Sequence, residues 1–231
     1  MLSFRWHRRL VAAVGLAIAV PAAAGEESAN APEPAVVLPA TGQTESYPVA
    51  RRNEPEPATV ADDGYLRAGA PLRYRDNEDG TITDLTTGLM WEKKCAGCDG
   101  PHDHRLRLRW SGDGKDATIW DWLDQLNAEG GKGFAGHDDW RVPNVKELVS
   151  IVNYGRVNPA LDGIFATSTC AAGCDDVTAS ACSCTAIGEY WTSTTFSDFP
   201  AHAIIVDLGL GFVDDRLKTN RHLVRAVRGG R

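Results

Sequence analysis

The chain has 231 residues, of which 43% are hydrophobic and 24% charged, as is typical of a soluble globular domain with some polar, extended chain. Its formal net charge is -7 at pH 7, and removing residues 1–24, which hold three arginines and no acid, changes it to -10. Such an acidic protein is a poor general binder of nucleic acid or anionic membranes, so these partners are excluded first.

Residues 1–24 have the pattern of a signal peptide. The positive residues are Arg5, Arg8 and Arg9. They precede an uncharged apolar run over residues 10–20 and a small-x-small site at residues 22–24 that predicts cleavage after Ala24. An uncleaved N-terminal anchor is the alternative, although the run is about half of the roughly 20 residues that span a bilayer. We expect an exported protein that is periplasmic, on the cell surface or secreted.

Residues 25–71 are rich in Ala, Pro, Glu, Thr and Ser, and they contain seven prolines. Such a composition cannot bury enough apolar surface to offset the entropy of the chain. We therefore predict a disordered spacer that holds the following domain away from a membrane or wall.

Residues 72–231 hold six of the seven tryptophans and form the predicted globular domain. Turn signals at residues 77–80 and 87–88 separate short alternating segments, which indicate β structure. A helix is expected over residues 115–127, with one buried face. That face would hold Ile119, Trp120, Leu123 and Leu126.

A second helix is expected after Asn144, which can cap it together with Glu147. Arg141 is expected to be a partly buried cation paired with Glu147 or Asp139. Four further strands are predicted over residues 190–195, 202–208, 211–217 and 223–228, the middle two forming a hairpin. This order of elements predicts an α+β fold with an antiparallel sheet.

Several segments resemble one known family in the order in which they occur. They are 74–84 (Tyr-Arg-Asp-Asn-Glu-Asp-Gly-Thr-Ile-Thr-Asp), 87–91 (Thr-Gly-Leu-Met-Trp), 136–148 (Gly-His-Asp-Asp-Trp-Arg-Val-Pro-Asn-Val-Lys-Glu-Leu), 190–194 (Tyr-Trp-Thr-Ser-Thr) and 224–230 (Val-Arg-Ala-Val-Arg-Gly-Gly). Together they resemble the Lcl C-terminal domain family, named after a bacterial collagen-like adhesin. The resemblance implies a C-type-lectin-like fold, distantly similar to the domain of formylglycine-generating enzymes, and a surface or periplasmic role. No catalytic residues are carried over.

The resemblance does not extend to calcium-dependent lectins, because the chain has neither a Glu-Pro-Asn nor a Trp-Asn-Asp signature. The acids between Asp76 and Asp84 suggest a calcium loop. With Gly80 in its sixth position, however, Arg75 occupies the first position and Thr86 the twelfth, where carboxylates are required. A hairpin turn without metal is the preferred interpretation.

The six cysteines are expected to form disulfides because the chain is predicted to be exported. They are Cys95, Cys98, Cys170, Cys174, Cys182 and Cys184. Cys95 and Cys98 would form a local bridge, and the pairing of the other four stays open. A zinc site that also uses His102 or His104 is the alternative.

The candidate binding residues are cations and residues of the 190–194 segment. They are Trp191, Ser193, Arg216, Lys218, Arg221, Arg225 and Arg228. Arginines can bind sulfate or carboxylate groups bidentately, and a tryptophan can stack on a sugar ring. Arg105, Arg107 and Arg109 form a second cluster that would share one face of a strand. Pairing of these cations with local acids on a solvated face is the competing interpretation, and for Trp191 a core position on a central strand is preferred to stacking on a sugar.

We therefore expect a non-enzymatic, adhesin-like module that binds a glycan or another extracellular ligand without a cofactor or metal. The alternative is a structural or protein–protein interaction domain of an envelope assembly. An enzyme is the third reading, because no catalytic constellation is recognisable.

Overall fold

The structure is a computed structural model that describes residues 38–47, 49–50, 52–53, 57–58, 60–167, 170 and 173–230. The predicted signal peptide, its cleavage site after Ala24 and residues 25–37 of the predicted spacer lie outside this part. Among the described residues, no helix is both long and apolar enough to cross a membrane.

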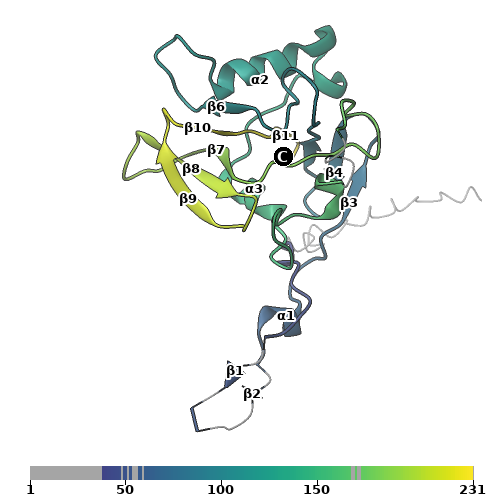
Figure 1. Cartoon of the computed structure of the whole chain (residues 1–231), viewed down its shortest axis with the longest axis vertical. Helices are drawn as coiled ribbons and strands as arrows, with labels where there is room; N and C mark the ends of the chain where they lie inside the picture. Colours follow the sequence, from purple (N-terminus) through teal and green to yellow (C-terminus); the bar gives the residue numbers. More distant parts are fainter. Residues whose placement is uncertain are drawn as a thin grey trace, which may run out of the picture. The chain divides into compact units, whose positions relative to one another are not determined.

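The chain alternates short strands with few helices, as Figure 1 shows. The strands are β1 (Val49–Ala50), β2 (Pro57–Ala58), β3 (Tyr74–Asp76), β4 (Thr81–Asp84), β5 (Met90–Glu92), β6 (Arg107–Arg109), β7 (Glu189–Thr195), β8 (His202–Asp207), β9 (Val213–Leu217), β10 (Arg221–Leu223) and β11 (Val227–Arg228). The helices are α1 (Asp63–Leu66), α2 (Ile119–Ala128) and α3 (Val145–Ser150), with 3-10 turns η1 (Glu129–Gly131), η2 (Phe134–Gly136) and η3 (Gly163–Phe165). The predicted α+β class is confirmed.

One sheet has four antiparallel strands in the order β11-β5-β4-β3. The two turns predicted from the sequence connect β3 to β4 and β4 to β5. Gly80 closes the first turn with a φ of 93°. A Cβ atom there would lie 2.7 Å from the Phe134 ring, so both backbone conformation and space favour glycine.

The second sheet has five strands in the order β6-β10-β7-β8-β9. Its β8–β9 hairpin confirms the predicted Gly-Leu-Gly turn, and β10 runs parallel to β7. Alternate residues of the central strands enter two different cores: Tyr190 and Val206 pack in one, Trp191 and Ile205 in the other. Both faces of the sheet centre are therefore buried, which explains the continuous apolar sequence of β8.

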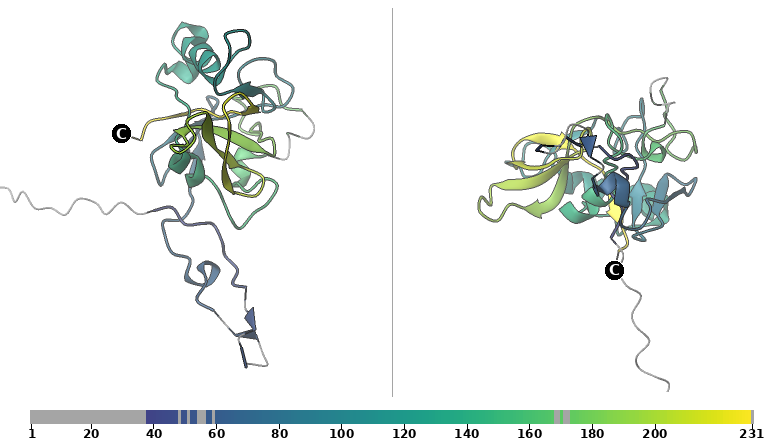
Figure 2. Two further views of the ribbon diagram at one scale, coloured as in Figure 1. Left: turned by 90° about the vertical axis from the view of Figure 1, so that its left-hand side faces the viewer. Right: turned by 90° about the horizontal axis from the view of Figure 1, so that it is seen from below.

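The strand predicted over residues 223–228 is divided between the two sheets. β10 ends at Leu223 in the five-stranded sheet, whereas β11 begins at Val227 in the four-stranded sheet. The crossing backbone is held by buried Glu92, whose Oε2 accepts the Ala226 N–H at 2.9 Å. The right-hand view of Figure 2 shows the yellow-green strands β8 and β9 apart from the blue strands β3 and β4.

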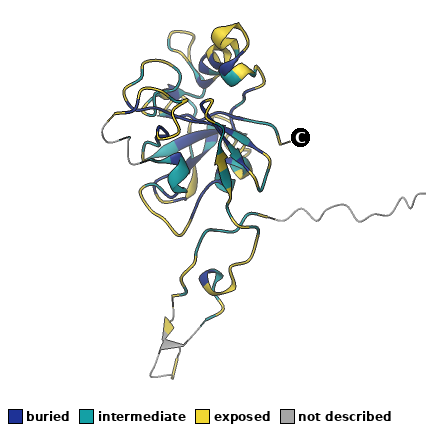
Figure 3. Ribbon diagram, turned by 90° about the vertical axis from the view of Figure 1, so that its right-hand side faces the viewer, coloured by how far each residue is buried: buried dark blue, intermediate teal, exposed yellow. Residues whose placement is uncertain are grey.

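Helix α2 begins later than predicted and buries a different tryptophan. Thr118 caps it in a capping box with Asp121, so residues 115–117 precede the helix. Its buried residues are Ile119, Trp122 and Leu126, whereas Trp120 is 38% exposed. The prediction that Trp120 lies on the buried face is therefore wrong. Figure 3 shows the exposed side of this helix in yellow.

Helix α3 is capped as predicted, by Asn144 with Glu147 in a reciprocal capping box. Glu147 also binds Arg141 bidentately, with Nη1–Oε2 and Nη2–Oε1 distances of 2.6 and 2.8 Å. The predicted pairing of Arg141 is thus confirmed for Glu147, while Asp139 binds Arg228 instead.

Three disulfides use all six cysteines, as predicted. They are Cys95–Cys98, Cys170–Cys184 and Cys174–Cys182. Cys174, Cys182 and Cys184 form a third buried cluster with Cys95 and Ala96, and Cys170 packs against it. Two of the disulfides close loops within the cysteine-rich segment. Backbone hydrogen bonds between Ala96 and Cys174, and from the Cys184 N–H to the Lys94 carbonyl, join this segment to the chain after β5.

Within the range predicted as spacer, the described residues include some local structure. Asp62 caps α1 and also accepts the Tyr47 N–H at 2.8 Å. Thr41 bonds the Asp63 carboxylate, and its carbonyl accepts the Tyr154 N–H at 2.7 Å. These contacts join residues 41–47 to α1 and to the chain after α3.

Candidate functional site

The five-stranded sheet brings the two basic clusters of the sequence together. β6 pairs antiparallel with β10, so that Arg109 lies opposite Arg221 and Arg107 opposite Leu223. Arg107 and Arg109 alternate around the buried Leu108, as expected for an extended segment. Clusters that are about 110 residues apart in the chain thus form one surface at the β6 edge of the sheet.

Two tryptophans adjoin these cations. Trp110 follows β6 and Trp120 begins α2, and their rings meet edge to face with centroids 4.9 Å apart. The Lys218 Nζ lies 3.9 Å from the centroid of the Trp110 ring, within the range of a cation–π contact. Trp110 is fixed because its Nε1 donates to the Thr192 carbonyl at 3.0 Å. A rigid indole, an exposed indole and an ammonium group therefore lie side by side.

The cations of this surface have few carboxylate partners. Arg109 and Arg221 share the single carboxylate of Asp116, at 3.2 and 3.0 Å. Lys218 has no carboxylate partner in the described part of the chain, and its Nζ donates to the Thr195 hydroxyl at 2.9 Å. We name the set Arg109, Trp110, Trp120, Lys218 and Arg221 the tryptophan–arginine surface. Its three cations have one carboxylate partner among the described residues, Asp116, and this favours an anionic ligand.

Two other candidate arginines are neutralised by neighbouring acids. Arg216 binds Glu189 on one side and Asp214 on the other. These bonds also raise the pKa of Arg216. Arg228 binds Asp139 at 2.7 Å, and this contact lowers the pKa of the Asp139 carboxyl. The competing interpretation, local pairing with acids, therefore holds for Arg216 and Arg228.

Arg225 is a core residue, not a ligand contact. Its side chain is 1% exposed and donates to the carbonyls of Glu92 and Cys184, each at 2.8 Å, and to the Thr185 hydroxyl at 2.9 Å. The prediction that Arg225 contributes to a docking surface is wrong, because the guanidinium is used inside the domain to bind backbone carbonyls.

Trp191 is also in the core, with 0% exposure and its Nε1 donating to the Leu108 carbonyl at 2.9 Å. The preferred core position of Trp191 is confirmed, and the alternative in which its ring stacks on a ligand is wrong, because neither face of the ring is accessible. Ser193, two residues on, is half-buried beside α3 and its N–H donates to the Pro143 carbonyl. The structure does not bring either residue together with Lys218 and Arg221 as one exposed site.

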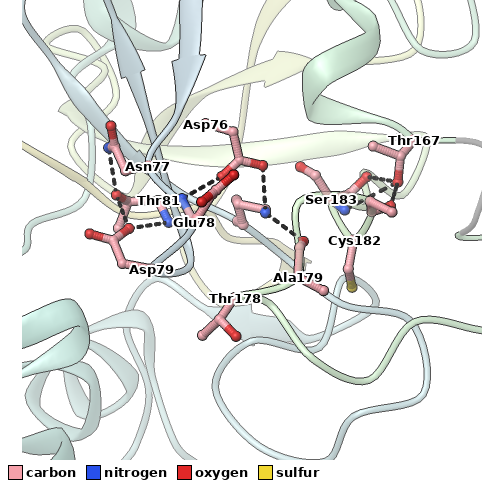
Figure 4. Close-up of polar contacts among 12 residues, drawn as sticks. Asp76, Asn77, Glu78, Asp79, Thr81, Thr167, Thr178, Ala179, Cys182 and Ser183 are labelled. Atoms are coloured by element: carbon pink, nitrogen blue, oxygen red, sulfur yellow. Dashed lines mark hydrogen bonds and ion pairs between the residues drawn. The ribbon is translucent and has the colours of Figure 1, made fainter.

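The acidic turn between β3 and β4 forms its own hydrogen bonds (Figure 4). Asp79 accepts the Thr81 N–H and hydroxyl, and Asp76 accepts the Glu78 N–H while binding Lys93 at 2.8 Å. These carboxylates thus act within a hairpin turn, in agreement with the preferred interpretation. The Lys93 Nζ also donates to the Ala179 carbonyl, which ties the turn to the cysteine-rich segment.

The histidines proposed as zinc ligands have other partners. His102 lies between Glu92 and Glu129, and the Nδ1 of His104 bonds the Cys95 carbonyl at 2.9 Å. The sulfur atoms of Cys170, Cys174 and Cys184 do lie within 4.8 Å of one another. In this structure they belong to disulfides, and no cysteine of the described chain is free.

A buried charge cluster lies beneath α2. Glu92 and Lys94 are fully buried and 2.8 Å apart, and the Lys94 Nζ lies 4.8 Å from the centroid of the Trp122 ring. Burial alone would raise the pKa of Glu92, but Lys94 and His102 outweigh it and hold this pKa below its usual value. The pKa of Lys94 is lowered, mainly by burial. The cluster is paired throughout, which suits a structural role.

Sequence reasoning missed Trp110 and Trp120 as site residues. The signal was present, since Trp110 directly follows the alternating arginines and two helical tryptophans occupy positions 120 and 122. These two positions point to different sides of a helix, so only one of them can be fully buried. The hydrophobic pattern alone placed the wrong one inside.

The comparisons with known proteins agree with this architecture. The sequence model of the Lcl C-terminal domain matches residues 80–228, which is more than half of the chain. No curated protein matches the chain. The matched range includes both large sheets except β3, all six cysteines and the whole tryptophan–arginine surface, and the chain belongs to the Lcl C-terminal domain family.

Proposed function

We propose that the protein is an exported, non-enzymatic binding module whose ligand is an anionic glycan, bound at the tryptophan–arginine surface. The predicted export signal of residues 1–24, the three disulfides and the spacer-like composition of residues 25–71 support a role outside the cytoplasm. The name of the family, taken from an adhesin, agrees with such a role.

The observation that carries the proposal is the contact of Lys218 with the Trp110 ring beside the exposed Trp120. Indole faces pack on the apolar face of a pyranose ring, and cations next to them can bind sulfate or carboxylate substituents. Arg221 is the most accessible arginine that presents a planar fork here, with 46% of its side chain exposed.

The proposal can be tested by binding the oxidised protein to an array of neutral and sulfated glycans, at low and at physiological salt, with calcium and with a chelator. We expect salt-sensitive binding to sulfated members, independent of calcium. Lys218→Ala and Arg221→Ala should each weaken it about two- to fivefold, the range for one exposed ion pair. Trp120→Ala should cost on the order of tenfold, as for an aromatic anchor at an interface.

Arg73→Ala is the matched control, because Arg73 is an exposed arginine just before β3, in the other sheet. It should leave binding unchanged. If the three substitutions in the tryptophan–arginine surface also leave binding unchanged, the glycan binds elsewhere on the protein. An array without any bound member would refute the glycan proposal.

A protein partner is the second candidate function, and a different surface favours it. Exposed apolar side chains gather at the β8–β9 turn, where Leu210 is 58% and Phe212 43% exposed. Tyr154, itself 41% exposed, joins them through a hydrogen bond from its hydroxyl to the Gly211 carbonyl. If Leu210→Ser and Phe212→Ser abolish capture of an envelope protein while the tryptophan and cation variants do not, the module is an interaction domain.

A further inference from the structure

The imidazole of His102 bridges two carboxylates that belong to different elements. Its Nδ1 lies 2.9 Å from Glu92 Oε1, at the end of β5, and its Nε2 lies 3.0 Å from Glu129 Oε2, directly after α2. The ring also packs on Phe134, with centroids 4.2 Å apart. The side chain of His102 is 12% exposed, so water competes little for either contact.

The two carboxylates differ in how firmly they are held. Glu92 is fully buried, and besides His102 it accepts from Lys94 Nζ at 2.8 Å and from the Ala226 N–H at 2.9 Å. Glu129 is 42% exposed, and His102 is its one side-chain partner in the described chain. A change at His102 therefore leaves Glu92 in place and frees Glu129.

Only the doubly protonated ring can donate to both carboxylates. A neutral imidazole has one N–H group and one lone pair, so the lone pair must face a carboxylate oxygen. The charged groups that face the ring are Glu92, Lys94 and Glu129. Burial alone would lower the pKa of His102, but its hydrogen bond to Glu92 and the charges of Glu92 and Glu129 raise it above its ordinary value.

This bridge adds to the contacts that join α2 to the chain leading into β6. The Pro101 carbonyl accepts from Trp122 Nε1 at 3.0 Å and from Lys94 Nζ at 2.8 Å, and neither contact is broken when His102 titrates. Glu129 is the one link at the C-terminal end of α2 that depends on the His102 charge. The N-terminal end of the same helix carries Trp120.

We propose that His102 is a pH-dependent clasp: its deprotonation releases Glu129, loosens the C-terminal end of α2, and thereby weakens the tryptophan–arginine surface. The part that concerns ligand affinity rests on the function proposed above. Since the proton stabilises the closed form, the clasp is closed below the pKa of His102 and opens as the pH rises through it.

The test begins with the full chain and no ligand. Proton NMR of the histidine rings, assigned with His102→Gln, should show that His102 titrates above the ordinary value of about 6.5. Glu129→Gln should lower that pKa, because one carboxylate charge is lost. Hydrogen exchange, corrected for its intrinsic pH dependence, should rise at residues 124–131 at alkaline pH in the native protein. In Glu129→Gln, whose amide can bond either protonation state of the ring, the exchange should no longer depend on pH, and in Glu129→Ala, which removes the link, it should be fast at all pH values.

His202→Gln is the control, because His202 pairs with Asp215 in the β8–β9 hairpin, away from α2. It should leave the titration of His102 and the exchange at residues 124–131 unchanged. An ordinary pKa for His102, or exchange at residues 124–131 that does not respond to pH, would overturn the clasp.

Ligand affinity then tests the coupling separately. A bound sulfated glycan should lose about two- to fivefold in affinity as His102 deprotonates, the effect of one ion pair, and this pH dependence should vanish in Glu129→Gln. If the NMR and exchange results show the clasp but glycan affinity does not depend on pH, the proposed effect of the clasp on binding is wrong and the clasp itself stands. No binding at any pH, with the NMR and exchange results intact, would refute the proposed function and leave the clasp.

Discussion

Arg225 and Arg221 lie four residues apart, yet the structure gives them opposite roles. Arg225 is enclosed by the Glu92 and Cys184 carbonyls, whereas Arg221 is 46% exposed and shares Asp116 with Arg109. We expect Arg225→Ala to lower the free energy of unfolding by about 3–5 kcal/mol, because buried acceptors lose a charged donor. Arg221→Ala should change it by less than about 0.5 kcal/mol.

Urea denaturation of both variants, monitored by tryptophan fluorescence, measures this difference. Circular dichroism at zero denaturant shows whether Arg225→Ala still folds. Equal stability of the two variants would contradict the assignment of Arg225 to the core.

Residue types could be predicted from the sequence more reliably than residue environments. The cysteines, the Asn144 cap and the Arg141–Glu147 pair were predictable because their partners are close in sequence or few in kind. The burial of Arg225 and the hydrogen-bond partner of the buried Trp191 were not predictable. They depend on strands β5 and β6, more than 80 residues away, which supply the Glu92 and Leu108 carbonyls.

At the scale of elements, Glu147 connects helix α3 to the rest of the fold. Its carboxylate receives the Asn144 N–H at 2.8 Å and two N–H groups of Arg141, which itself donates to the Gly229 carbonyl. We expect Asn144→Ala to cost about 1 kcal/mol, the usual effect of losing a helix cap. Glu147→Gln should cost more, about 2–3 kcal/mol, because it also removes the charge that faces the half-buried Arg141.

Thermal and urea denaturation of these variants measure both effects, and Lys146→Ala serves as the control. Lys146 is exposed on the same helix and makes no ion pair among the described residues. If Glu147→Gln were no worse than Asn144→Ala, the carboxylate would act only as a cap.

The edge strand β9 explains why Arg216 is not free for a ligand. The Asp214 carboxylate accepts the Asp215 N–H at 2.9 Å, and Arg216 Nη1 donates to the Asp215 carbonyl at 2.7 Å. Side chains thus occupy backbone groups that could otherwise pair with another strand. The sequence identified Arg216 as a candidate cation. Which groups it binds depends on the position of β9 in the sheet, and the local sequence does not determine the order of the strands.

At the scale of the whole molecule, two sheets share one crossing segment and one buried charge cluster. Residues 224–226 pass from one sheet to the other, and Glu92 and Arg225 bind across that passage. The sequence predicted the strands and the class of fold. It could not predict this joint, because a local pattern of Val, Arg and Ala fits an uninterrupted strand as well as a crossing.

From the ionisable groups of this joint and its surroundings, we expect the free energy of unfolding to be largest between acid and alkaline pH. Glu92 and Asp139 have lowered pKa values. They therefore contribute fully to the free energy of unfolding above about pH 4.5, and this contribution is lost as the pH falls through their lowered pKa values. His222, whose pKa is lowered mainly by burial, also costs stability below about pH 6.5. His102 acts in the opposite direction. Its contribution is complete below about pH 6.5 and is lost as the pH rises through its raised pKa.

Melting temperatures of the oxidised protein between mildly acidic and alkaline pH measure this profile. We expect the native protein to lose stability on the alkaline side, and His102→Gln to be less stable near neutrality but to lose no more as the pH rises. The acid side should become shallower, because this substitution removes one of the two groups that hold the Glu92 pKa below its usual value, while the Asp139–Arg228 pair is unchanged. If His102→Gln still loses stability at alkaline pH, that loss comes from the tyrosines and lysines, and the His102 proton does not contribute to the pH dependence of stability.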